Sequence, residues 1–161
     1  MAVTSYTEEF TSTVSPVRLF KALVTESHVF IPKAVPGGIK SVEFLEGDGG
    51  AGSIKQTNLV DGGKLKFMKH RIDVVDVENL YTKYTLIGCD IEFEKVESVV
   101  SEIKFEAAPG GGCVCKMTSE YHVKAGYELK VEEVKEGKLR ASGLFKAVEE
   151  YLVAHPEECC A

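Results

Sequence analysis

The sequence predicts an α+β domain in which a curved, seven-stranded antiparallel sheet carries its helices on one side. Three observations predict this class. Strand-like runs separated by turn residues fill residues 39–121. Two short helix signals precede these runs, and a long helical stripe of apolar residues follows them. The chain has 161 residues, a usual length for one domain, so we expect a single domain over residues 1–161.

The N-terminal part is predicted to hold one strand and two short helices. Val3–Phe10 is typical of a strand. Ser15 is a preferred N-cap and is followed by proline at the first helical position, which predicts a helix over Pro16–Val24. A second short helix is expected over Glu26–Ile31, where Pro32 and the residues after it should end it.

The middle of the chain is predicted to form six further strands. Turn residues separate the runs, among them Asp61-Gly62-Gly63 and Pro109-Gly110-Gly111-Gly112. Consecutive strands joined by short turns favour antiparallel pairing. The predicted strands are Ile39–Leu45, Ser53–Leu59, Leu65–Val74, Leu80–Ile87, Val96–Ala107 and Val114–Val123.

The C-terminal part is predicted to form one helix of about 24 residues, from Val131 to Ala154. His155-Pro156 should end it. The rims of a strongly curved sheet would contact such a helix more readily than the centre of the sheet would. The pattern is therefore compatible with a hollow between the helix and the sheet. The apolar residues that recur at helical spacing are Val131, Val134, Ala141, Leu144, Phe145, Val148 and Leu152.

Charge and hydropathy argue against several protein classes. The net charge of −6 gives no general attraction to nucleic acid. The sequence holds no run of about 18 apolar residues that would predict a membrane span. The first ten residues lack the apolar segment of a signal peptide. We therefore expect a cytoplasmic protein that contacts no membrane and, in the main interpretation, no nucleic acid. We also expect it to be a monomer.

The cysteines are expected to be free thiols, because their number is odd and the expected compartment is reducing. Cys113 and Cys115 should point to one face of a strand. No histidine stands at a metal-ligand spacing from them, so we expect no metal and no cofactor. The five cysteines are Cys89, Cys113, Cys115, Cys159 and Cys160.

Several segments of the sequence are similar to one plant family. The run from Glu46 to Lys55, Glu-Gly-Asp-Gly-Gly-Ala-Gly-Ser-Ile-Lys, resembles the glycine-rich loop of the class-ten pathogenesis-related proteins, the birch-pollen major allergen family. The loop commonly has proline where this chain has Ala51, and the C-terminal Cys159-Cys160-Ala161 also departs from the family. The resemblance covers essentially the whole chain and continues through Arg18–Ala22, Lys69–Asp73, Ser101–Lys104, Glu120–His122 and Ala147–Leu152.

The resemblance implies a sheet that grips the long helix, two short helices in a V, and a large hydrophobic cavity. It implies intracellular binding, transport or storage of hydrophobic and amphipathic small molecules such as cytokinins, flavonoids, steroids and fatty acids, in plant defence and stress. Two alternatives stay open. One is a low-activity ribonuclease. The other is a ligand-dependent regulator of a partner protein, as the related abscisic acid receptors are, although the Gly47–Gly52 loop stands where their gate would be.

Candidate ligand-binding residues follow from the resemblance and from alternation along the strands. Thr82, Tyr84 and Leu86 share one face, a mixture of apolar and hydroxyl groups that suits a pocket and would equally fill a solid core. His70 should be neutral beside Lys69 and Arg71. The resemblance implies that the cavity is lined by Tyr6, Leu23, Phe67, His70, Thr82, Tyr84, Val99, Cys115, Met117, Arg140 and Leu144.

Two further sets of residues belong to the segments of the resemblance: the glycines of the loop and the positions proposed for ribonuclease action. Gly47, Gly49, Gly50 and Gly52 allow a tight hairpin, whereas the nucleotide-binding motif G-x-x-x-x-G-K-[ST] is absent, so we expect a rigid turn. The positions proposed for ribonuclease action match Lys55, Glu97, Glu149 and Tyr151. Glu149 and Tyr151 are two residues apart on a helix and should not face each other.

Overall fold

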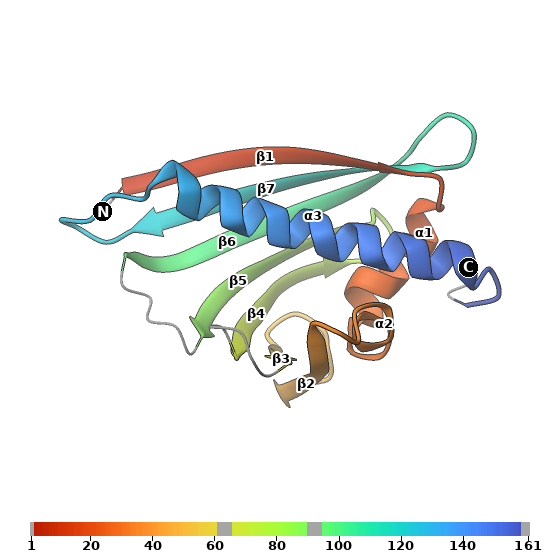
Figure 1. Ribbon diagram of the computed structural model, residues 1–161, viewed down its shortest axis with the longest axis horizontal. Coiled ribbons are helices and arrows are strands. Elements are labelled where there is room, and N and C mark those ends of the chain that lie inside the picture. Colours follow the sequence, from red (N-terminus) through yellow and green to blue (C-terminus); the bar gives the residue numbers. More distant parts are fainter. Residues whose placement is uncertain (1, 61–65, 90–94, 159–161) are drawn as a thin grey trace.

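A computed structural model gives the structure of the protein and describes residues 2–60, 66–89 and 95–158 (Figure 1). It confirms the predicted fold class and the order of the elements. The predicted turn at Asp61-Gly62-Gly63 and the cysteines Cys159 and Cys160 lie outside the described residues. The elements are β1 (Ala2–Ser12), α1 (Pro16–Phe20), the π-helical turn η1 (Lys21–Thr25), α2 (Ser27–Ala34), β2 (Ile39–Glu46), β3 (Ile54–Leu59), β4 (Phe67–Asp76), β5 (Tyr81–Cys89), β6 (Val96–Ala107), β7 (Cys113–Val123) and α3 (Val131–Ala154).

The seven strands form one antiparallel sheet in the order β1-β7-β6-β5-β4-β3-β2. The register shifts in the β2–β3, β4–β5 and β6–β7 pairs, and such bulges bend a sheet. α3 crosses one face of the curved sheet, while α1 and α2 lie near the C-terminal end of α3 (Figure 1). We call the face of the sheet that is turned toward α3 the inner face.

The short helices differ from the prediction in two places. The predicted helix Pro16–Val24 is α1 followed by η1, in which the Glu26 N–H donates to the Lys21 carbonyl at 2.8 Å. The second helix does not end at Pro32 but contains it. Because Pro32 lies in the last turn, the helix forgoes only one backbone bond, and the Val35 N–H still closes on Ile31 at 3.0 Å.

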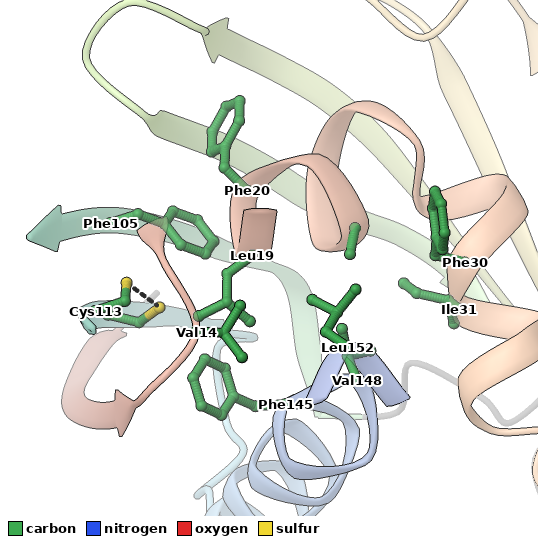
Figure 2. Packing of buried hydrophobic residues seen from close by; sticks show 12 residues of the cluster. Val14, Leu19, Phe20, Phe30, Ile31, Phe105, Cys113, Phe145, Val148 and Leu152 are labelled. Carbon is green, nitrogen blue, oxygen red and sulfur yellow. Dashed lines mark hydrogen bonds between the residues drawn. The ribbon is translucent and has the colours of Figure 1, made fainter. Parts of the chain in front are cut away.

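The packed core lies at the C-terminal end of α3 (Figure 2). Leu19 of α1 and Leu152 of α3 are completely buried, and the Phe145 ring stacks on Phe10 of β1 with centroids 4.9 Å apart. The N-terminal half of α3 also contacts the sheet, because Val134 is 3% exposed, although Leu139 remains 64% exposed. Among the described residues, the core cluster lies at the C-terminal end of the helix. Among the described residues, no helix combines the length and the hydropathy needed to span a membrane.

Arg18 joins α1 to the end of α3. Its Nη2 donates to the carbonyls of Leu152 and His155, both at 3.1 Å, and to the carbonyl of Glu158 at 2.9 Å. The last carbonyls of a helix lack partners inside the helix and carry the negative end of its dipole. One guanidinium thus satisfies and neutralises the C-terminus of α3.

Replacing Arg18 by Met should lower the free energy of unfolding by about 2–4 kcal/mol, because several charge-assisted hydrogen bonds are lost together. Urea unfolding monitored by circular dichroism measures the loss. Lys33→Met is the control, since it removes an exposed ion pair to Glu158 at 3.4 Å and should cost at most about 1 kcal/mol. Equal losses in the two variants would contradict the role given to Arg18.

Candidate ligand-binding site

Polar side chains form a continuous band across five strands of the inner face. Lys55 of β3 pairs in register with His70 of β4, and Ser101 of β6 pairs with both Tyr84 of β5 and Ser119 of β7. Residues directly opposite each other in an antiparallel pair share a face. We call these five residues the polar band.

Neighbouring members of the polar band contact one another. The His70 and Tyr84 rings meet edge to face with centroids 5.3 Å apart. The Ser101 hydroxyl hydrogen-bonds to the Tyr84 hydroxyl and lies 3.4 Å from Ser119 Oγ. At the other end, Lys55 Nζ donates to Ser27 Oγ of α2 at 3.4 Å. The band thus runs from the short helices to β7.

Burial changes the ionisation of three members of the band. It lowers the pKa of Lys55 to about 8 and raises the pKa of Tyr84 to about 12, against the opposing effect of the Ser101 hydrogen bond. Burial, with the nearby Lys55 charge, lowers the pKa of His70 to about 3. His70 is therefore neutral at physiological pH, as expected from the sequence.

The cause of the His70 shift differs from the one that the sequence suggested. Its chain neighbours alternate to the opposite face, where Arg71 Nε donates to Asp73 at 2.7 Å and Lys69 lies over the Phe67 ring. The cation that acts on His70 is Lys55, across the strand pair. Desolvation is the larger cause.

The three titrating side chains are half-buried despite these shifts. Side chains of the packed core, such as Leu19 and Leu152, keep no accessible surface. Lys55, His70 and Tyr84 therefore lie deep in the fold without being covered by packed side chains.

Most of the other predicted lining residues also belong to the inner face. Tyr6 meets Tyr121 edge to face with centroids 5.9 Å apart, and Val99 and Met117 stand on the same face by register. Leu23 and Leu144 are half-buried against the core cluster. Arg140 is exposed, and its charge acts on the Tyr121 phenol, opposing the rise in pKa that burial causes.

Two predicted lining residues are packed too tightly to present much surface. Cys115 is 1% exposed, lies in the core cluster, and has its sulfur 3.7 Å from that of Cys113. Thr82 is 3% exposed and donates its hydroxyl to the Val74 carbonyl at 3.0 Å. Both therefore lie on the inner face but present little accessible surface. Cys113 and Cys115 are free thiols, as expected.

Phe67 lies on the outer face, which corrects its expected place in the lining. It pairs with Asn58, whose side chain bonds Ser41 and Glu43 away from α3, and it alternates with His70. A surface recess of about 260 Å³ adjoins it. That recess is lined by Lys40, Ser41, Asn58, Leu59, Lys66 and Phe67.

The N-terminal half of α3 sits close to β1 and β7. A pocket of about 20 Å³ remains beside Tyr6, Tyr121 and Lys138, which is room for about one water molecule. A Cβ atom at Gly137 would lie 2.9 Å from the Tyr121 hydroxyl oxygen, so glycine permits this close approach. The Lys138 ammonium lies 4.9 Å from the Tyr6 ring centroid.

The glycine-rich loop is a self-contained turn, in agreement with the sequence-based expectation. Gly47 has a φ of +80°, and a Cβ there would clash with Ser53 Oγ. The N–H of Gly49 donates to Ser53 Oγ, that of Gly50 to Asp48, and that of Gly52 to the Ile72 carbonyl. These three N–H groups are therefore not directed at a ligand.

The four positions proposed for ribonuclease action are not brought together. Glu97 lies near the start of α3, because Lys95 contacts Glu133. Tyr151 lies near the other end, about 27 Å further along the helix at its usual rise per residue, and donates to Glu158 at 2.6 Å. Glu149 is half-buried and Lys55 lies in the polar band. The ribonuclease alternative stays a prediction.

Sequence reasoning missed two residues of the polar band. Ser101 is named above only as part of the segment Ser101–Lys104 that carries the resemblance, and Ser119 is not named. Ser27 carries no sequence signal for this site, because only the packing of α2 against the sheet brings it to Lys55.

Comparison with known proteins agrees with the fold. The profile of the pathogenesis-related protein Bet v 1 family matches residues 1–155. Pathogenesis-related protein STH-2 of Solanum tuberosum is 51% identical over 156 residues, covering 97% of each chain. Major allergen Pru ar 1 of Prunus armeniaca is 45% identical over 157 residues, covering 98% of each chain.

Solved structures extend the comparison. The crystal structure of Ara h 8.0201 superposes with a TM-score of 0.86 at 35% identity, covering 96% of this chain and 100% of that one. Norcoclaurine synthase from Thalictrum flavum, in complex with dopamine and hydroxybenzaldehyde, shares the fold at 23% identity with a TM-score of 0.72, covering 96% and 88% of the two chains. Sequence and structure together place this chain in the pathogenesis-related protein Bet v 1 family.

Proposed function

We propose that the protein binds hydrophobic and amphipathic small molecules between the inner face of the sheet and α3. The observation that carries the proposal is the polar band: three of its side chains, those of Lys55, His70 and Tyr84, are strongly desolvated, yet they keep accessible surface. Such a combination is expected of groups that line a cavity deep in a protein, with apolar walls and a few polar anchors.

The chemistry of the band fits an amphipathic ligand. Neutral His70 offers one donor and one acceptor, Tyr84 and Ser101 offer hydroxyls, and Lys55 offers a cation. Val99 and Met117 provide apolar surface beside them. Burial of apolar area contributes about 25 cal/mol per Å², and the polar groups set the orientation.

The related fold of norcoclaurine synthase holds two small aromatic molecules, which supports the use of this architecture for ligand binding. For this chain we propose a carrier or store of plant metabolites such as cytokinins, flavonoids, steroids or fatty acids, acting in defence and stress. We further propose that it works as a cytoplasmic monomer and as one ligand-binding domain.

Titration with the hydrophobic dye anilinonaphthalene sulfonate tests the proposal. We expect one dye molecule per chain with a dissociation constant near the micromolar range, about −8 kcal/mol. A cytokinin and a flavonoid should displace the dye, and native mass spectrometry of protein from its own tissue should show a co-purified molecule. Binding that does not saturate at one site would contradict an internal site.

A further inference from the structure

In the part of the chain that the structure describes, Lys55 has no carboxylate counter-ion. Its hydrogen-bond partner is the neutral Ser27 hydroxyl, at 3.4 Å. The residue paired with it on β2 is Phe44, and the residue paired on β4 is His70. Within residues 2–60, 66–89 and 95–158, no carboxylate lies within ion-pair distance of its amine.

The charged and titratable groups of the neighbouring elements are directed elsewhere. Glu26, which precedes Ser27, pairs with Lys21 at 3.4 Å, and His28 packs edge to face on Phe44. Asp73 of β4 pairs with Arg71 on the outer face. Among the described residues, no carboxylate therefore offsets the desolvation of protonated Lys55.

Desolvation makes the neutral amine accessible near physiological pH. With a pKa of about 8, about 10% of Lys55 is unprotonated at pH 7, against about 0.03% for an ordinary lysine. The unprotonated amine is the nucleophile toward carbonyl carbon. Lys55 is only half-buried, so a molecule in front of the polar band can reach it.

We propose that Lys55 captures aldehyde ligands as a reversible imine. This inference rests on the proposed ligand-binding function and names the ligand class: flat, apolar aldehydes whose ring packs beside His70, Tyr84 and Phe44. The reacting carbon would sit at the Lys55 Nζ end of the polar band, near Ser27.

The reaction needs no oxidant or reductant. The Lys55 nitrogen lone pair forms a bond to the carbonyl carbon, the C=O π electrons move to oxygen, and a proton passes from nitrogen to that oxygen. The carbinolamine then loses its hydroxyl as water with the second nitrogen proton, and the C=N bond forms. Water carries these protons, and neutral His70, at the paired position, can hydrogen-bond to the carbinolamine.

The test treats the full chain with anisaldehyde and sodium cyanoborohydride, which reduces an imine to a stable secondary amine. Peptide mapping by mass spectrometry locates the adduct. We expect labelling of Lys55 to exceed that of Lys69 at least about tenfold, because Lys69 lies on the outer face of the adjacent strand beside Phe67. Lys55→Arg keeps the positive charge and should abolish this adduct, whereas Lys69→Arg should not change it.

A second measurement separates this inference from the proposed function. Anisyl alcohol, which cannot form an imine, should displace the dye from wild type and from Lys69→Arg, while circular dichroism shows that Lys55→Arg is folded. Displacement by the alcohol with no preferred adduct at Lys55 would overturn the imine and leave ligand binding intact. Failure of both the alcohol and the aldehyde to displace the dye would overturn both.

Discussion

The Ser101→Phe variant is expected to bind the hydrophobic dye at least about tenfold more weakly than wild type, a loss of about 1.4 kcal/mol or more. Ser101 stands in the middle of the polar band, 6% exposed, between Tyr84 and Ser119. A phenyl ring at this position must project from the inner face toward α3. It would occupy the space that the proposed ligand needs and would break the hydrogen bond to Tyr84.

Ser98→Phe is the matched control for this experiment. Ser98 lies on the same strand, and its partner is His122, whereas the next pair along the strands, Val99 and Tyr121, faces α3. By alternation Ser98 therefore points to the outer face. Dye titration of both variants, with circular dichroism to confirm folding, should show weakened binding in Ser101→Phe alone. Equal affinities in the two folded variants would place the dye site elsewhere.

Replacing Leu152 by Ala should lower the free energy of unfolding by about 3–5 kcal/mol, among the larger losses seen for a buried leucine. Leu152 keeps no accessible surface and belongs to the core cluster that joins α3 to α1 (Figure 2). The large effect is expected because this end of the fold is packed solid and cannot collapse around a cavity. Urea unfolding with an unchanged m-value measures it.

Val153→Ala provides the comparison for the core substitution. Val153 is the next residue of α3, and it is 58% exposed. Its truncation removes little buried area and slightly improves helix propensity, so we expect a change within about 0.5 kcal/mol. If Leu152→Ala were as mild as Val153→Ala, the end of α3 would not be the anchor that the structure indicates.

Much of the fold could be predicted because local patterns agree with the tertiary structure. The bounds of α3, Val131–Ala154, and of β6, Val96–Ala107, match the prediction residue for residue. In both segments the hydrophobic period extends over most of the element. Pro32 misled the prediction of α2, because a proline in the last turn removes little from a helix that is held by packing against β2.

The candidate site was predictable only in part. Strand alternation correctly separates Tyr84 and Ser101 from the outer face, and it also separates Phe67 from His70, although the family resemblance grouped these two. Alternation indicates which residues share a face of the sheet, but not how closely other side chains pack over that face. It could not tell that Cys115 is sealed in the core while His70 keeps accessible surface.

By itself the sequence determined the order of the elements, the limits of the long helix and the inner and outer faces of the strands, because these follow from periods of 3.6 and 2 along the chain. Only the tertiary structure decided the state of Lys55. Its desolvation arises where β2, β4 and the start of α2 surround it without supplying a carboxylate, and no local pattern records which distant groups will meet an amine in the folded chain.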